Sequence, residues 1–313
     1  MIRDIDTEQF FSRIYEDYDR YFIIPVAMLV VSMAILAGSF LVNDQVFEKG
    51  TDFEGGNQVI YNVGNGTSEE EVSQAFIDYE QADWQPQDVS VRTQVGSPNI
   101  ISVRTPPPII ESNSQAEQIL TGAGTEAEVD QLISLSGILG QEFLFQAQIA
   151  FVLAFTIMSL VIFTAFRDFI PAAAVVFAAT GDIMMAATGM VVFGIPLTLG
   201  SVAALLMLIG YSVDTDIVMS MRVLKQRRGS VEEKIWSAVK TGVTMSSGGI
   251  AGFSLLYLVS MAIVGPTELS RISAVMVMGL MADIPLTYFG NGVIISKYVN
   301  GKFDNLAGKI PWT

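Results

Sequence analysis

The sequence predicts an α-helical membrane protein with six transmembrane helices and one small α+β domain outside the bilayer. Of its 313 residues, 51% are hydrophobic, and these gather in long blocks rather than at the spacing of a globular core. Six blocks carry little or no charge, and each is long enough to cross about 30 Å of hydrocarbon as a helix. The stretch between the first two blocks is acidic and mixed in composition, which is typical of a soluble domain.

The blocks set the expected domain organisation. We expect spans at residues 21–42, 143–166, 171–193, 196–221, 241–264 and 272–296. The first block lacks a small-residue cleavage motif, which favours a retained anchor over a signal peptide. Aromatic and aliphatic residues recur at helical spacing before it, which predicts an interfacial amphipathic helix. The chain thus divides into an amphipathic segment at 1–20, a first transmembrane helix at 21–42, an external domain at 43–142, a five-helix bundle at 143–299 and a cytoplasmic tail at 300–313.

The basic residues predict the orientation in the membrane. Of the 17 Lys and Arg residues, 13 lie before the first span, in the loops after the second and fourth spans, or after the sixth. Such residues concentrate on the cytoplasmic side of membrane proteins. We therefore expect a multi-pass protein of the cytoplasmic (cell) membrane, with both termini in the cytoplasm and residues 43–142 extracellular.

The external segment is strongly acidic. Residues 43–142 contain 17 acidic and 3 basic residues, a net charge of 3 minus 17, or −14. This charge excludes a nucleic-acid partner. It suits an acidic surface adapted to high salt, as in a halophilic organism, or a docking face for basic partners. The chain has no cysteine or histidine, which excludes thiol chemistry and histidine-ligated metals, so we expect no cofactor, no metal site and no enzymatic activity.

The order of elements in the external segment predicts a ferredoxin-like βαββαβ fold. A β-branched and aromatic run at 57–63 precedes Ser68 and Glu71, which have the spacing of a helix capping box. Two further β-rich runs flank a Gly-Pro turn at 96–98 and predict a hairpin. A helix near 114–120 and a strand near 132–135 would complete the sheet. Helices would cover one face, and we expect a client to contact the open face.

Four aspartates interrupt the predicted spans: Asp182, Asp214, Asp216 and Asp283. A carboxylate in hydrocarbon costs about 2.5–3.5 kcal/mol on insertion scales. No Lys or Arg lies at comparable depth in the sequence, so the four cannot all be ionised, and at least one could load and release a proton. The alternative is that each acid forms hydrogen bonds with neighbouring spans and only fixes helix packing.

Asp214 and Asp216 cannot serve one site together. Two residues correspond to about 200° on a helix, so the two side chains face opposite sides. Arg222 lies about 12 Å further along and about 80° around from Asp214, within reach of a long side chain. This spacing favours Asp214 over Asp216 as the ion-coupling carboxyl of the fourth span.

Two sequence motifs resemble the SecF subunits of the SecD/SecF protein-export family in their archaeal form. "TDFEGG" at 51–56 resembles the family signature after the first span, and "GYSVDTDIVMSMRVLK" at 210–225 is similar to the family's fourth-span segment. The matching signature positions are Asp52, Phe53, Gly55, Gly56, Gly210, Tyr211 and Ser212. Two departures are Thr51 in place of glycine and an Asp-Thr-Asp sequence in place of Asn-Asp-Thr.

The resemblance implies a half-transporter of the resistance-nodulation-division superfamily. Its implied partners are SecD, the Sec translocon, unfolded preprotein and membrane lipids. It implies use of a proton or sodium gradient to move an external domain that holds preprotein during export. The residues leave two alternatives open, a scaffold or chaperone subunit without its own ion coupling and a half-size exporter of lipids or solutes.

The Gly55-Gly56 pair also has a physical interpretation. Glycine adopts backbone angles that other residues avoid, so the pair could act as a hinge between the first span and the external domain. A tight turn that enters the first strand explains the same residues equally well.

Overall fold

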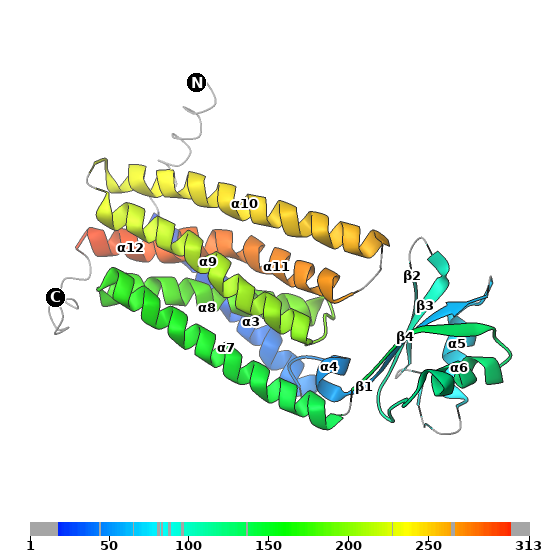
Figure 1. The fold of residues 1–313 in the computed structure, drawn as a ribbon. Helices are drawn as coiled ribbons and strands as arrows, with labels where there is room; N and C mark the ends of the chain where they lie inside the picture. The colour runs from blue at the N-terminus through cyan, green and yellow to red at the C-terminus, as the bar shows by residue number, and fades with distance from the viewer. Residues whose placement is uncertain are drawn as a thin grey trace.

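A computed structural model describes residues 18–301 except 44, 65, 80, 81, 83, 87, 88, 95, 96, 136, 227 and 264–266. Figure 1 shows a long helical bundle with a small sheet domain at one end. The predicted amphipathic segment before residue 18 and the tail after residue 301 lie outside the described residues. A contact of 3.8 Å between Asp19 and Lys297 joins the start of the first span to the end of the last.

Six helical segments of the described chain are long and apolar enough to cross a membrane, which confirms the predicted fold class. The bundle consists of α2 (Tyr18–Tyr21), α3 (Ile23–Asn43), α7 (Gly137–Phe166), α8 (Phe169–Val192), α9 (Leu199–Lys225), α10 (Val231–Ile263), α11 (Glu268–Pro285), the π-helix η1 (Leu286–Asn291) and α12 (Gly292–Val299). Several helices extend beyond the expected spans: α7 begins six residues before 143, α10 ten residues before 241 and α11 four residues before 272. The sixth span is also interrupted by η1.

Helices α8, α9 and α11 form the centre of the bundle. In each of these three spans about half of the residues are buried, whereas the spans of α3, α7 and α10 are mostly exposed. The buried face of α8 is largely alanine, which lets neighbouring helices approach closely. Helix α9 starts with a capping box, in which Thr198 and Ser201 each accept a backbone N–H of the other.

The external domain has the predicted βαββαβ order. Four antiparallel strands pair in the order β2-β3-β1-β4. The elements are β1 (Gly56–Val63), α5 (Glu69–Ile77), β2 (Ser90–Gln94), β3 (Ser97–Thr105), α6 (Asn113–Gly122) and β4 (Ala127–Leu135), and a short helix α4 (Thr51–Glu54) precedes them. The last strand is longer than predicted because it pairs along the whole of β1.

One face of this sheet packs against α5 and α6. The predicted capping box of α5 is present, because Ser68 and Glu71 bond each other's backbone N–H. Tyr61 lies in the core against Phe76, and its hydroxyl donates to the Ala116 carbonyl at 2.8 Å. Burial raises the pKa of the Tyr61 hydroxyl well above its usual value. The alternate residues of the strands form the opposite, helix-free face.

The glycine pair forms a tight turn into the sheet. Gly55 and Gly56 have φ of 79° and 125°, and Gly56 already pairs with Leu135 on β4. A Cβ on Gly56 would collide with the carbonyl oxygen of Thr105. These contacts fit the turn interpretation, and they place Gly56 inside the sheet rather than between two bodies that move.

Asn57 ties three parts of the domain together. This fully buried side chain donates to Thr105 Oγ1 at 3.0 Å and to the Pro108 carbonyl at 2.8 Å. Its own carbonyl oxygen accepts from Ile110 N at 2.7 Å and from Ser134 Oγ at 3.0 Å. All the hydrogen-bonding capacity of the amide is therefore used, with partners on β3, on β4 and in the segment that follows β3.

We predict that Asn57→Ala destabilises the external domain by about 2–4 kcal/mol, because it leaves buried donors and acceptors without partners. Pulse proteolysis of the purified full-length chain in increasing urea should show a midpoint lowered by about 1–2 M. Asn62→Ala, an exposed position on the same strand, serves as the control and should leave the midpoint unchanged. Equal midpoints for Asn57→Ala and Asn62→Ala would contradict the assigned network.

Candidate functional site

Three of the four predicted intramembrane acids meet at the centre of the bundle. Asp182 on α8, Asp216 on α9 and Asp283 on α11 are each fully buried. We call these three residues the carboxyl cluster. Asp182 and Asp283 lie within hydrogen-bonding reach of each other.

Asp216 and Asp283 share a hydroxyl partner. The Thr287 Oγ1 atom lies 3.0 Å from Asp216 Oδ1 and 3.0 Å from Asp283 Oδ1. A hydroxyl has one proton to donate and two lone pairs that accept. Thr287 can therefore donate to one of the two carboxylates. It can accept from the other acid at the same time only if that acid is protonated. This geometry accommodates one proton between the two carboxyls.

The remaining contacts of the cluster are also uncharged. Asn291 Nδ2 donates to Asp216 Oδ1 at 2.8 Å, and Ser246 Oγ on α10 donates to Asp283 Oδ2 at 3.0 Å. Ser212 on α9 donates to Asp182 Oδ2. Two buried carboxyl oxygens, Asp182 Oδ1 and Asp216 Oδ2, have no hydrogen-bond partner among the described residues.

No cation within the described chain contacts this cluster. Its partners are hydroxyl and amide groups, and the two ion pairs of the described residues lie elsewhere. Three buried carboxylates without cations would repel one another in a medium of low dielectric constant. This repulsion is smaller when one of the three acids is protonated.

The π-helix η1 shapes this site. It follows Pro285, which cannot donate the usual backbone hydrogen bond and so disturbs the helix. The wider turn carries Thr287 and Asn291, and both side chains point to Asp216. Such π-helical turns within α-helices are frequent at functional sites.

Sequence reasoning missed three polar partners of the cluster, Ser246, Thr287 and Asn291, and also Ser220, whose hydroxyl accepts from Asn291 Nδ2 at 3.3 Å. A signal for most of them was present. Ser212, Asp216 and Ser220 follow one another at intervals of four, and so do Asp283, Thr287 and Asn291. Residues four apart share a helix face, so each set marks a polar stripe that faces the interior. Ser246 stands outside both stripes.

Asp214 and Asp216, of which helical spacing favoured Asp214 as the coupling candidate, lie in different surroundings. They do face opposite sides of α9, but Asp214 is exposed and Asp216 is buried. Arg222 does not turn back toward Asp214. Its Nη1 donates to the carbonyl and hydroxyl of Ser237 and to the hydroxyl of Thr241, at 2.6, 3.0 and 2.8 Å, on helix α10.

The first signature motif contacts the start of α9. Asp52 Oδ2 accepts from the backbone N–H of Leu199, the first residue of α9, at 3.0 Å. Backbone bonds join Gly50 N to Leu197 O and Leu197 N to Glu48 O, both at 2.7 Å. A carboxylate at a helix N-terminus is stabilised by the helix dipole. The sheet domain is thus attached to the N-terminal end of the helix that carries Asp216.

Other signature residues take structural positions. Phe53 is buried, and its carbonyl lies against Gly140 of α7, where a Cβ would collide with it. Gly210 has open space around it, and the half-exposed Tyr211 makes an edge contact with Phe253. Gly210, Tyr211 and Asp214 thus lie on the outer surface of α9, away from Ser212 and the carboxyl cluster.

Comparison with known proteins gives consistent matches. Residues 115–301 match the family described as "Protein export membrane protein SecD/SecF, C-terminal". Protein-export membrane protein SecF of Methanothermobacter thermautotrophicus is 34% identical over 293 residues, which cover 92% of this chain and 95% of that protein. SecF of Haloferax volcanii is 34% identical over 295 residues, 93% of this chain and 96% of that protein.

A solved structure shares the fold. SecDF from Thermus thermophilus superposes with a TM-score of 0.71 and 21% sequence identity over 91% of this chain, which corresponds to 38% of the SecDF chain. The bundle and the inserted sheet domain therefore occur on a known scaffold. From the family match over more than half its length and from relatives that align with nearly all of it, the chain belongs to the SecD/SecF family of protein-export membrane proteins.

Proposed function

We propose that this protein is an accessory subunit of the Sec protein-export machinery that acts with SecD and uses an ion gradient to promote preprotein translocation. Family membership supports the role in export. The observation that carries ion coupling is the carboxyl cluster, three buried acids on three helices with only neutral partners. A cluster that binds a cation can respond to a gradient of that cation.

The proton is the coupling ion that this geometry favours. Asp182, Asp283, Thr287 and Asp216 form a continuous line of groups that can donate and accept protons. When Asp283 is protonated, it donates to Thr287, which donates to Asp216. When the proton moves to Asp216, both bonds reverse. Each step changes which of α9 and α11 carries the buried charge, and that charge determines how the helices attract each other.

Helix α9 is the element that transmits such a change to the outside. Asp216 belongs to the cluster, while Leu199 at the outer end of the same helix bonds Asp52. Asp52 lies in α4, directly before β1 of the external domain. A shift of α9 would therefore pull on the domain that we propose to contact preprotein outside the cell, with both termini in the cytoplasm.

The exposed face of α9 supports association with SecD. Asp214 and the half-exposed Tyr211 are polar groups on a span, next to the uncovered Gly210. A carboxyl facing lipid costs several kcal/mol, so this face requires a protein partner. Small residues also permit close helix contact. The scaffold alternative also explains this face, and it assigns the carboxyl cluster to helix packing alone.

We predict that Asp216→Asn reduces export to the level of cells that lack the protein, while complex formation with SecD is retained. The amide keeps the shape and its bonds to neighbours, but it cannot take up a proton. Export of a secreted reporter and co-purification of SecD are the two measurements. Normal export by Asp216→Asn would contradict ion coupling through this residue.

Asp214→Asn is the matched control, with the same chemical change two residues away on the opposite face. We expect it to retain ion-coupled export wherever SecD still co-purifies. A defect equal to that of Asp216→Asn, with SecD bound normally, would contradict the assignment of the two faces.

We further predict that Asp52→Ala lowers export without disturbing either domain, because it removes the side-chain bond between α4 and the start of α9. Asp52→Asn retains an acceptor oxygen and should restore part of the activity. Protease resistance of the external domain is the control for folding. Export at the normal rate in Asp52→Ala would show that movement is transmitted by another contact.

A further inference from the structure

Tyr288 is a buried ionisable residue that the proposed proton line does not include. It lies on η1, with only 5% of its surface exposed. Its hydroxyl has no hydrogen-bond partner among the described residues. A buried hydroxyl without a partner lowers stability, whereas phenylalanine would fill the same space without this cost. Packing alone therefore does not explain why a tyrosine occupies this position.

The Tyr288 hydroxyl lies beside the carboxyl cluster, where η1 meets α10. Asp283 and Asp216 both act electrostatically on it, which places it near two of the three acids. On α10 it lies against Gly242, where a Cβ would collide with the hydroxyl oxygen. Ser246, which donates to Asp283, is four residues further along the same helix. Gly242 thus gives the phenol room one helical turn from the cluster.

Polar groups continue from Gly242 toward the end of the bundle that is remote from the sheet. Helix α10 runs from that end, where α9 and α10 are joined, to the sheet domain (Figure 1). Thr241 directly precedes Gly242, and its hydroxyl and that of Ser237 accept from Arg222. From the α9–α10 connection inward, α10 therefore presents two hydroxyl groups, then the space for the phenol, then the serine that contacts the cluster.

The neighbours of Tyr288 hold its backbone but leave its hydroxyl able to change partners. The Tyr18 hydroxyl donates to the backbone carbonyl of Tyr288. A phenol hydroxyl both donates and accepts. A proton that arrives on the phenol oxygen can therefore replace the phenol's own proton, which moves to a carboxylate of the cluster. The phenol is neutral after the transfer, and rotation of its O–H bond restores the starting arrangement.

We propose that Tyr288 relays protons between the carboxyl cluster and the end of the bundle remote from the sheet, with Gly242 providing the space for its hydroxyl. This inference rests on the proposed ion coupling and names the group through which the cluster exchanges protons with that end. The charged groups around the route are Asp216 on α9, Asp283 on α11 and Arg222 near the α9–α10 connection. A water molecule that bonds the phenol and Asp216 Oδ2 would give both buried groups a partner.

Proton flux across a membrane tests the relay. The purified full-length protein is reconstituted with SecD in lipid vesicles, and a pH difference drives a flux that an enclosed fluorescent pH indicator records. We expect Asp216→Asn to abolish the flux. Tyr288→Phe should lower it about a hundredfold, since a positioned acid–base group accelerates proton transfer by roughly 10²–10⁴.

Tyr257→Phe is the matched control, because it makes the same chemical change at an exposed position of α10. It should leave the flux unchanged. Normal flux in Tyr288→Phe, with none in Asp216→Asn, would overturn the relay and leave the proposed ion coupling intact. Normal flux in Asp216→Asn would instead overturn the ion coupling on which the relay rests.

Variants at Gly242 separate a relay from simple packing. Gly242→Ala places a methyl group against the Tyr288 hydroxyl and should lower the flux by displacing it. When Gly242→Ala is combined with Tyr288→Phe, the colliding oxygen is gone, and the methyl group would meet the ring at Cζ, 3.2 Å away. The double variant should therefore regain the thermal unfolding midpoint of the unmodified protein, yet keep the low flux of Tyr288→Phe. Recovery of normal flux in the double variant would show that the hydroxyl only fills space and would refute the relay.

Discussion

The need to satisfy carboxyl groups inside a membrane-embedded bundle governs this structure. Asp182, Asp216 and Asp283 are buried among helices, and each finds a hydroxyl or amide partner. These bonds connect α8, α9, α10, α11 and η1, so the same contacts that make the acids tolerable also hold the central helices in register. The stability of the bundle centre and the proposed proton exchange therefore depend on one set of contacts.

Most of the fold could be predicted from the sequence. A membrane span is specified by composition over about 20 residues, and the external domain by turn and capping signals such as Ser68 and Glu71. The interruption at η1 could not be predicted with confidence from Pro285 alone, because prolines in spans end, kink or widen a helix according to their neighbours. The full length of β4 depends on its pairing with β1, which is a tertiary contact.

The site was harder to predict for a physical reason. In a soluble helix the polar face is the outer one, but a transmembrane helix is apolar toward lipid and toward its neighbours. The sequence could therefore predict that Asp214 and Asp216 lie on opposite faces of α9. It could not predict which of the two faces points into the bundle. The stripe of Ser212, Asp216 and Ser220 identifies the inner face, because hydroxyl groups repeated every four residues have no hydrogen-bond partners in lipid. A pairwise argument from Arg222 was weaker, since α10 offers that side chain nearer partners.

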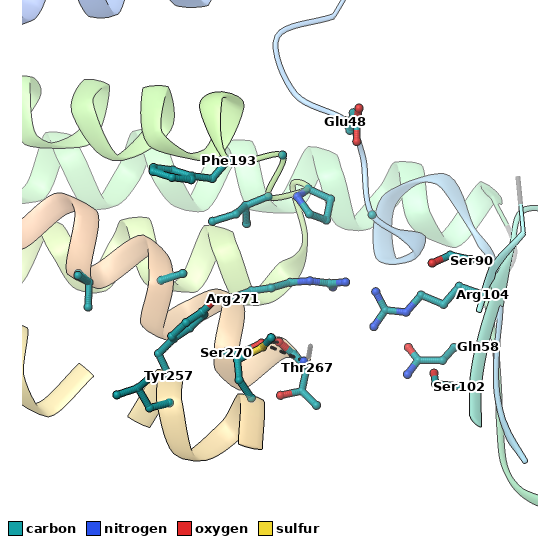
Figure 2. A pocket seen from close by; sticks show the side chains of 18 of the residues that line it. Glu48, Gln58, Ser90, Ser102, Arg104, Phe193, Tyr257, Thr267, Ser270 and Arg271 are labelled. Carbon is teal, nitrogen blue, oxygen red and sulfur yellow. Dashed lines mark hydrogen bonds between the residues drawn. The ribbon is translucent and has the colours of Figure 1, made fainter. Parts of the chain in front are cut away.

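The position of the glycine turn has a mechanical consequence. Gly56 pairs within the sheet and Asp52 bonds the start of α9, so hydrogen bonds at the signature motif connect α9 through α4 to β1. Asp216 lies 17 residues from Leu199, about 25 Å along a helix. A small rotation of α9 at the cluster would thus displace the sheet, because a helix with intact hydrogen bonds transmits the rotation along its length without bending. A cavity of about 1040 Å³ lies on the path of that displacement, between the sheet and α11 (Figure 2).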